Sequence, residues 1–252
     1  MPEHLVSSDQ VAVSYIALRA RVIDLLRSTP ESSGNIVVPC TPEWTIRQLA
    51  AHLVGVPEDV LAGRMEGVAS DAWTHAQVER YGDLTLTELA DLFESSAPKI
   101  DAIIHNFPQP IISQFVMDAV THEQDMRRAL GIHGHLSGPV AEHTIDRLIS
   151  TIPIVIGKRA STPDGQSVVI DITADPVLGG VRRHIICTVV NGRAALIDIE
   201  PEAPLCRLTM DTQTFLTLAT GRRKAGEATH PIEYAGDLIH GHKIVASMNM
   251  MI

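Results

Sequence analysis

Three side chains in the middle of the sequence have the types and the spacing of a metal-binding cluster. Asp118, His122 and Asp125 follow one another at intervals of four and three positions in a segment that reads as a helix. This spacing places all three on one helical face, where Asp118 and His122 can converge on one divalent ion. Burying two carboxyl groups and an imidazole is costly unless a metal ion, a charge partner or water satisfies them. The alternative is a half-exposed helix face on which Asp125 pairs with Arg127 or Arg128, because an Asp-x-x-x-His pattern alone is not specific.

A third ligand for such an ion would come from His52, which lies beside the apolar stripe of another predicted helix. Its neighbours Leu49 and Leu53 belong to that stripe, so His52 is close to the face expected to point into the core. A histidine in such a place is usually a hydrogen-bonded core residue, but with Asp118 and His122 it would complete a His/Asp/His site. Three protein ligands leave an open coordination position, which is the arrangement of a catalytic metal centre. Zinc is the first choice for these ligands, and nickel and iron are alternatives.

The first half of the sequence predicts helices that would present these residues. The expected helices begin near Ser8, begin at Thr45, run from Thr85 towards Ile104, and cover about 111–130. Capping boxes formed by Thr45 with Gln48 and by Thr85 with Glu88 mark two of the starts. Pro98 is expected to kink or interrupt the third helix. Four helices of this length predict a bundle whose core is lined from facing helices.

The second half of the sequence changes in character and contains strands. We expect a helix over about 140–160, strands at 167–173 and 205–210, and helices at 212–219 and 238–250. The Asn191-Gly192 pair predicts a hairpin turn between two apolar strands within 182–199. The expected fold class is therefore α+β, with a metal-binding four-helix bundle in residues 1–138 and a smaller α+β domain in residues 139–252.

The composition limits the classes of partner. Hydrophobic residues make up 45% and charged residues 20% of the 252, as in a packed globular protein, and the net charge of −10 argues against nucleic acid as a partner. Cys40, Cys187 and Cys206 are odd in number and lack CxxC spacing, which argues against a disulfide scaffold and a thiolate metal cluster. The N-terminus lacks the layout of a signal peptide, and no apolar run reaches the roughly 18 residues of a membrane span. We therefore expect a cytoplasmic protein without a membrane span.

Two stretches of the sequence resemble motifs of the mycothiol-dependent maleylpyruvate isomerase family, whose proteins are DinB-like metal-binding four-helix bundles with a small C-terminal α+β domain. The first stretch is 40–55, CTPEWTIRQLAAHLVG, and the second is 118–131, DAVTHEQDMRRALG. Thr220-Gly221-Arg222, Gly236-Asp237 and the closing 248–252 resemble the smaller domain of the family. The resemblance spans nearly the whole chain. It is fairly specific for the superfamily and much less so for one reaction.

The resemblance implies that His52, Asp118 and His122 are the metal ligands, the same three that the spacing indicates. The family pattern usually has glutamate where this chain has Asp118, which is one methylene shorter, so an ion would lie closer to the helix of Asp118 or bind more weakly. Asp125 would orient His122 through its second ring nitrogen, or form a structural ion pair with Arg128. By the same resemblance, Arg222 would hold a substrate carboxylate as a catalytic residue, whereas its alternative role is that of a surface arginine.

The leading hypothesis from the sequence is a metal-dependent enzyme that uses mycothiol as co-substrate. Its reaction would be a cis–trans isomerisation or a thiol S-transfer on a small molecule that carries a carboxylate or is electrophilic. A second hypothesis is a metal-dependent hydrolase on the same bundle. A third is a non-catalytic protein that binds a small molecule or lipid. A protein-bound divalent cation would lower the pKa of a coordinated thiol and so favour its thiolate. In the leading hypothesis this thiol belongs to mycothiol, so the enzyme needs no catalytic cysteine.

Overall fold

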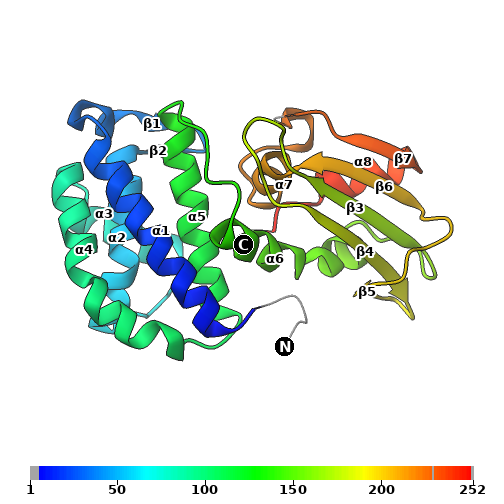
Figure 1. Ribbon diagram of the computed structural model, residues 1–252, viewed down its shortest axis with the longest axis horizontal. Coiled ribbons are helices and arrows are strands. Elements are labelled where there is room, and N and C mark those ends of the chain that lie inside the picture. The colour runs from blue at the N-terminus through cyan, green and yellow to red at the C-terminus, as the bar shows by residue number, and fades with distance from the viewer. Residues whose placement is uncertain (1–5, 229, 251–252) are drawn as a thin grey trace. The chain divides into compact units, whose positions relative to one another are not determined.

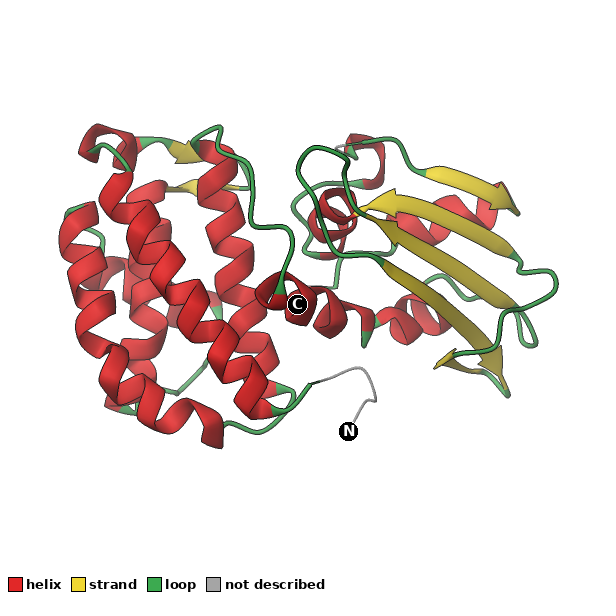
Figure 2. Cartoon of the chain, in the orientation of Figure 1, coloured by secondary structure: helices red, strands yellow, loops and turns green. Residues whose placement is uncertain are grey.

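A computed structural model describes residues 6–228 and 230–250, so the end of the closing motif, residues 251–252, lies outside the described residues. The contacts within the chain divide it into two compact units, one formed by Val6–His133 and one that begins at Gly134. The division lies a few residues before the expected domain boundary. Helices make up most of the first unit, and the second unit contains the large sheet (Figures 1 and 2).

The first unit contains a bundle of four long helices and one additional helix. Its α-helices are α1 (Ser8–Ser28), α2 (Ile46–Ala62), α3 (Asp71–Tyr81), α4 (Leu86–Ile103) and α5 (Ile111–Ala129). Helices α1 and α2 each pack against both α4 and α5, and this closes the bundle, while α3 packs against α2. Short 3-10 helices follow α1 (η1, Glu31–Asn35) and α4 (η2, Ile104–Asn106), and strands β1 (Val37–Val38) and β2 (Thr41–Thr45) form an antiparallel pair just before α2.

The predicted helix starts in the bundle are confirmed. Thr45 caps α2 in a capping box with Gln48, and Thr85 caps α4 in a capping box with Glu88. Each box satisfies backbone N–H groups of the first turn that have no partner within the helix. Helix α5 ends just before Gly131, whose φ of +68° is the left-handed conformation that glycine adopts most readily after a helix.

Two features of the first unit differ from what the sequence predicts. Helix α4 is continuous through Pro98, so the expected interruption there is wrong. Pro98 and Glu94, whose carbonyl loses its partner to the proline, are both exposed, so water can satisfy that carbonyl. Helix α3 was not expected, because only Gln77 and Val78 of its residues are buried and its apolar pattern is correspondingly weak.

The second unit is a mixed five-stranded sheet with helices. Its helical elements are α6 (Pro139–Ile149), the π-helical η3 (Ile154–Arg159), α7 (Thr212–Ala219), the 3-10 helix η4 (Ala225–Glu227) and α8 (Leu238–Ala246). Its strands are β3 (Ser167–Thr173), β4 (Arg183–Val190), β5 (Arg193–Ile197), β6 (Cys206–Asp211) and β7 (Glu233–Gly236), in the sheet order β5-β4-β3-β6-β7. Strands β3 and β6 are parallel and the other neighbours antiparallel. Elements η3, α7 and α8 pack against the sheet.

The expected strands and the expected α+β class are confirmed, with two corrections in the second unit. The hairpin turns at Asn191 and Gly192, both at positive φ, as the sequence predicts. The single helix expected over 140–160 is instead α6 and η3, because Pro153 cannot continue the hydrogen bonding of α6. Strand β7 was not expected. Among the described residues, no helix is long and apolar enough to cross a membrane.

Candidate metal centre

The structure brings His52, Asp118 and His122 together inside the first unit. His52 lies on α2 and the other two lie on α5, which packs against α2. One ligand atom from each residue lies within 4.8 Å of the other two. Nε2 of His52 is 3.7 Å from Oδ2 of Asp118, and Nε2 of His122 is 3.5 Å from Oδ1 of Asp118. The imidazole rings of the two histidines meet edge to face, with their centroids 4.9 Å apart.

These separations suit a divalent metal ion. A tetrahedral ion with ligand bonds of about 2.1 Å holds neighbouring ligand atoms about 3.4 Å apart. The two measured separations run to different oxygens of Asp118, and with one atom per residue the three ligands lie within 4.8 Å, so each pair has to close by at most about 1.4 Å around one ion. Two imidazoles and one carboxylate are also a donor set that zinc and related metals accept. The side chain of Asp118 is 30% exposed, whereas those of His52 and His122 are 5% and 9% exposed, so solvent reaches the cluster on the side of Asp118.

The charges in the cluster shift the pKa values of Asp118 and His122 in opposite directions. Burial alone would raise the pKa of the Asp118 carboxyl group, but the positive charge and hydrogen bonding of His122, with a smaller effect of His52, hold it well below its usual range. Burial alone would lower the pKa of His122, but Asp118, and then Asp125, raise it to about 9. Without a metal ion, His122 is therefore an imidazolium group paired with an aspartate at neutral pH.

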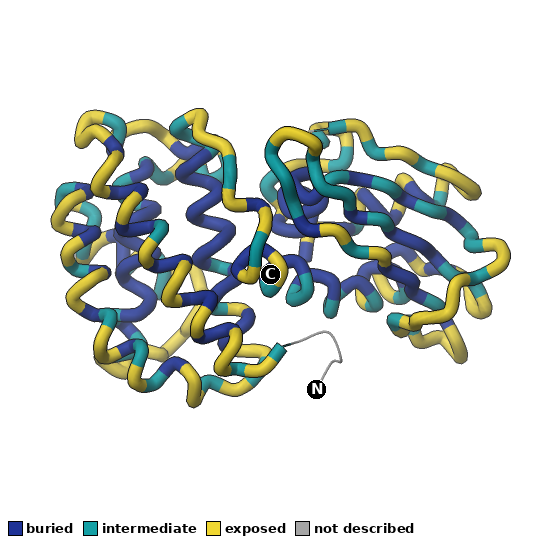
Figure 3. Tube along the Cα trace, viewed as in Figure 1, coloured by how far each residue is buried: buried dark blue, intermediate teal, exposed yellow. Residues whose placement is uncertain are grey.

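Asp125 forms the ion pair with Arg128 and also lies near His122, without a hydrogen bond to its Nδ1. One carboxylate oxygen, Oδ2, lies 3.4 Å from Nδ1 of His122, on the opposite side of the ring from Asp118. The other oxygen, Oδ1, pairs with Arg128. A carboxylate behind a ligating histidine orients the ring and increases its basicity. Asp125 is fully buried, and Figure 3 shows the run of buried residues along this part of α5.

Helix α5 carries a second buried carboxylate directly beside the cluster. Glu123 has no exposed surface and accepts hydrogen bonds from Arg21 on α1 and from Arg127 on α5. The Arg21–Glu123 pair connects α1 to α5, the helix that carries two of the three candidate ligands, whereas the Arg127–Glu123 pair lies within α5.

His52 also has a partner on the ring nitrogen that faces away from Asp118, and the sequence analysis did not identify it. Nδ1 of His52 lies 2.7 Å from Oε1 of Gln77 on α3. Gln77 in turn contacts Asp59, which lies two turns beyond His52 along α2 and is 1% exposed. The signal that could have revealed this partner is the Ser70-Asp71 start of α3, where the Ser70 hydroxyl caps the helix.

An aromatic ring borders the cluster next to His52. Trp44, in β2, lies with its ring centroid 5.6 Å from that of His52, and the planes are inclined by 40°. The indole is half-buried, so it covers one side of the imidazole and leaves part of its own surface accessible. An amphipathic ring at such a place offers a contact surface for the apolar part of a small molecule.

The remaining predicted site residue, Arg222, lies in the second unit just after α7. It is half-buried, and its Nη1 donates a hydrogen bond to the carbonyl oxygen of Thr220. The predicted role of Arg222 in holding a substrate carboxylate stays a prediction.

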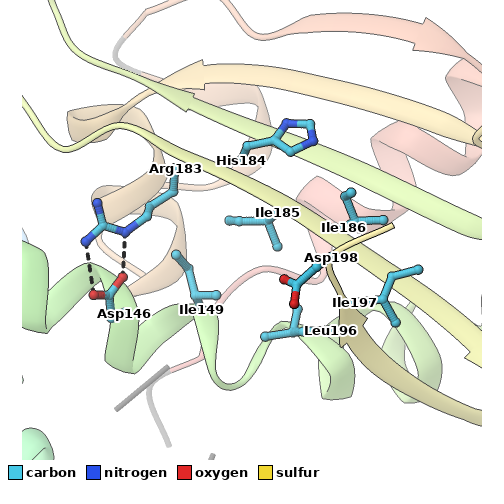
Figure 4. A pocket seen from close by; sticks show the side chains of 9 residues that line it. All are labelled: Asp146, Ile149, Arg183, His184, Ile185, Ile186, Leu196, Ile197 and Asp198. Atoms are coloured by element: carbon cyan, nitrogen blue, oxygen red, sulfur yellow. Dashed lines mark hydrogen bonds and ion pairs between the residues drawn. The ribbon is translucent and has the colours of Figure 1, made fainter. Parts of the chain in front are cut away.

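A pocket in the second unit has a different character from the metal cluster. It is lined by residues of α6, β4 and β5 and by Asp198, and most of the lining side chains are apolar (Figure 4). Its arginine, Arg183, forms a two-pronged ion pair with Asp146 at 2.7 and 3.0 Å. Because this guanidinium is already bonded to a carboxylate, the pocket is a poor site for an anionic substrate.

Among solved structures, the chain is similar to the crystal structure of the mycothiol-dependent maleylpyruvate isomerase, with a TM-score of 0.52 and 11% sequence identity over 91% of this chain and 93% of that chain. It is also similar to a mutant of that isomerase, with a TM-score of 0.48 and 11% identity over 86% and 90% of the two chains. No family profile and no curated protein matches the sequence. The chain thus has the fold of the mycothiol-dependent maleylpyruvate isomerase structure, and the resemblance seen in the sequence motifs is confirmed at the level of fold.

Proposed function

We propose that the first unit binds a divalent metal ion through His52, Asp118 and His122, with zinc as the first choice. We propose further that the chain is a mycothiol-using enzyme of the maleylpyruvate isomerase type. The observation that carries the proposal is the convergence of three ligand atoms from two helices within 4.8 Å, in a chain with the fold of that isomerase. The reaction would be a cis–trans isomerisation or a thiol S-transfer on a small molecule that carries a carboxylate or is electrophilic.

The residues of this chain would do three things in such a reaction. In this proposal Gln77 holds the ring of His52 through its hydrogen bond, and the nearby Asp125 carboxylate orients the ring of His122, so that each Nε2 faces Asp118. A divalent metal bound there lowers the pKa of a coordinated thiol and so supplies a thiolate near neutral pH. In this proposal the thiol reaches the site from the solvent-exposed side of Asp118. The Trp44 indole covers His52 and shields that part of the site from water. In this proposal Arg222 binds the substrate carboxylate with its guanidinium group.

Metal analysis of protein purified without a histidine tag tests the metal site. We expect about one divalent ion per chain, with zinc binding retained after dialysis, and loss of the ion in His52→Ala. The matched control is His105→Ala, which removes an exposed histidine from the same unit and should leave the metal content unchanged. Metal-free wild-type protein, or equal metal content in His52→Ala and the wild type, would contradict the site and favour a non-catalytic protein that binds a small molecule or lipid.

The dependence of the reaction on thiol tests the enzyme class separately. With a cis-enedioate-type acid or an electrophile as substrate, the metal-loaded protein should turn over only when mycothiol is present. A metal-dependent reaction that is equally fast without mycothiol would contradict the isomerase and transferase versions. That result would favour the metal-dependent hydrolase, in which water occupies the open position of the metal.

A further inference from the structure

A line of buried polar side chains leads away from the candidate metal centre, on the side of His52 opposite to Asp118. Nδ1 of His52 lies 2.7 Å from Oε1 of Gln77, and Nε2 of Gln77 donates to Oδ2 of Asp59 at 2.8 Å. The other oxygen of Asp59, Oδ1, accepts hydrogen bonds from Arg64 and Arg80, both at 2.5 Å. His52, Gln77 and Asp59 are 4%, 0% and 1% exposed, so water is excluded as a general substitute partner along this line.

Arg64 and Arg80 fix which group donates and which accepts in each hydrogen bond from Asp59 to His52. A carboxylate bonded by two guanidinium groups is only an acceptor, so the group that Gln77 turns towards Asp59 has to be its NH₂. The carbonyl oxygen of Gln77 then faces His52. An amide oxygen is only an acceptor as well, so Nδ1 of His52 has to be the ring nitrogen that carries the proton. The lone pair of the neutral ring is then left on Nε2, the atom that lies 3.7 Å from Asp118.

We infer that Gln77, oriented by Asp59, is a positioning residue that keeps the proton of His52 on Nδ1 and the lone pair of Nε2 directed into the metal centre. This inference rests on the metal site proposed above. It adds a residue from α3, a helix that supplies none of the three candidate ligands. The tautomer of His52 affects the metal affinity, because a ring protonated on Nε2 cannot bind a metal ion through that atom.

Packing leaves Gln77 little freedom to turn away. A methyl group built on Gly55 of α2 would lie 2.6 Å from Cβ and 2.7 Å from Cγ of Gln77. The stem of the glutamine therefore rests directly on the backbone of α2, three residues after His52. The side chain can still exchange its oxygen and nitrogen by rotating the amide group, and the hydrogen bond to Asp59 favours one of the two orientations.

This reasoning predicts that Asp59→Asn reverses the tautomer of His52. The oxygen of the new asparagine would stay with Arg64 and Arg80, which donate, so its NH₂ would face Gln77. Gln77 would then turn its oxygen towards residue 59 and its NH₂ towards His52. Nδ1 of His52 would have to accept that hydrogen bond, and the ring proton would move to Nε2, where it blocks the metal.

A second substitution should restore the original arrangement. In the double variant Asp59→Asn with Gln77→Glu, the NH₂ of residue 59 donates to one oxygen of the new carboxylate, and the other oxygen accepts from Nδ1 of His52. The pair of side chains thus exchanges amide and carboxylate, so the hydrogen bond between residues 59 and 77 reverses while Nδ1 of His52 still donates to residue 77. Loss of the tautomer in the single variant and its recovery in the double variant is a pattern that a general packing defect does not produce.

The test uses the full-length, metal-free protein with ¹⁵N-labelled histidine, at alkaline pH. Long-range ¹H–¹⁵N correlation spectra report which ring nitrogen carries the proton. We expect the Nδ1–H form of His52 in the wild type and in the double variant, and the Nε2–H form in Asp59→Asn. The signals of His122, whose Nδ1 faces Asp125 on its own helix, serve as the internal control and should not change. Asp91→Asn is the matched control, since it makes the same change at an exposed carboxylate paired with Arg27.

Metal affinity, measured by competition with a chelator for Zn²⁺, is the second readout. Asp59→Asn is expected to bind Zn²⁺ about 10- to 100-fold more weakly than the wild type, and the double variant should recover most of that loss. If Asp59→Asn does not fold, Gln77→Met replaces it, because it keeps the volume and removes both polar groups. His52 should then populate both tautomers.

The outcomes separate this inference from the proposed metal site. A His52 ring that remains in the Nδ1–H form in Asp59→Asn, or in Gln77→Met where that variant replaces it, overturns the role of Gln77 whether or not the protein binds metal. Wild-type protein that shows the predicted tautomers but binds no Zn²⁺ overturns the metal site and leaves the orientation of His52 by Gln77 standing. Recovery of the tautomer in the double variant without recovery of the lost affinity overturns the link between the two.

Discussion

The affinity of the first unit for a divalent metal ion is expected to rise steeply with pH from neutrality to about pH 9. The cause is His122, whose pKa is raised to about 9 by Asp118 and Asp125 against the opposing effect of burial. A metal ion binds the neutral imidazole, so below that pKa it has to displace a proton from His122. The apparent affinity therefore falls about tenfold for each pH unit below about 9. At neutral pH the penalty is about 100-fold, or ~2.7 kcal/mol.

Chelator competition for Zn²⁺ at a series of pH values measures this dependence, and calorimetry in buffers of different ionisation enthalpy counts the released protons. We expect close to one proton from His122 per ion at neutral pH and none well above pH 9. Asp125→Asn removes one of the groups that raise the pKa of His122. In that variant the pH at which the affinity becomes constant should move down. An affinity that is already constant above about pH 6.5, the ordinary pKa of histidine, would refute the reasoning.

Two further predictions concern the packing and the charges around the centre. Gly55→Ala places a methyl group 2.6 Å from Cβ of Gln77, so we expect a loss of about 1–3 kcal/mol in unfolding free energy together with weaker Zn²⁺ binding. The control Gly226→Ala meets open space and should stay within about 0.5 kcal/mol of the wild type in urea unfolding; equal effects of the two would contradict the packing argument. Glu123→Gln removes a fully buried carboxylate that pairs with the half-buried Arg21 and the buried Arg127, and should cost about 3–5 kcal/mol in urea unfolding, against less than about 1 kcal/mol for the exposed Glu94→Gln. A Glu123→Gln effect as small as that of Glu94→Gln would show that the buried pair contributes little.

The sequence predicts the bundle well where local chemistry marks it. The capping boxes at Thr45 and Thr85 are satisfied by residues three positions away, so they act in any context and can be read without the fold. The helical spacing of Asp118 and His122 is local for the same reason. That His52 faces them is a tertiary contact between α2 and α5, and only its place beside an apolar stripe hints at it.

The prolines show where local rules fail. Pro98 and Pro153 both lack the backbone N–H group that a helix uses, yet α4 continues through the first and α6 ends before the second. Helix α2 also continues through the buried Pro57, so neither the residue type nor its exposure decides alone where a helix ends, and the packing of the rest of the helix is not stated by the sequence. Helix α3 was missed for a related reason. It buries a glutamine whose polar groups are satisfied by Asp59 and His52, and a pattern of apolar residues cannot show such a contact.

The position of the candidate ligands on α2 and α5 has a consequence for folding thermodynamics. His52 and Asp118 are 66 positions apart, and the chain between them includes all of α3 and α4. Bringing such distant residues together costs the unfolded chain about 4 kcal/mol of loop-closure entropy, so the unfolded chain lacks the site. An ion held there would bind the folded first unit only, and at 100 times its dissociation constant it would stabilise that unit by about 2.7 kcal/mol. Metal concentration would then influence the melting temperature of the first unit, whereas the second unit contains none of these ligands.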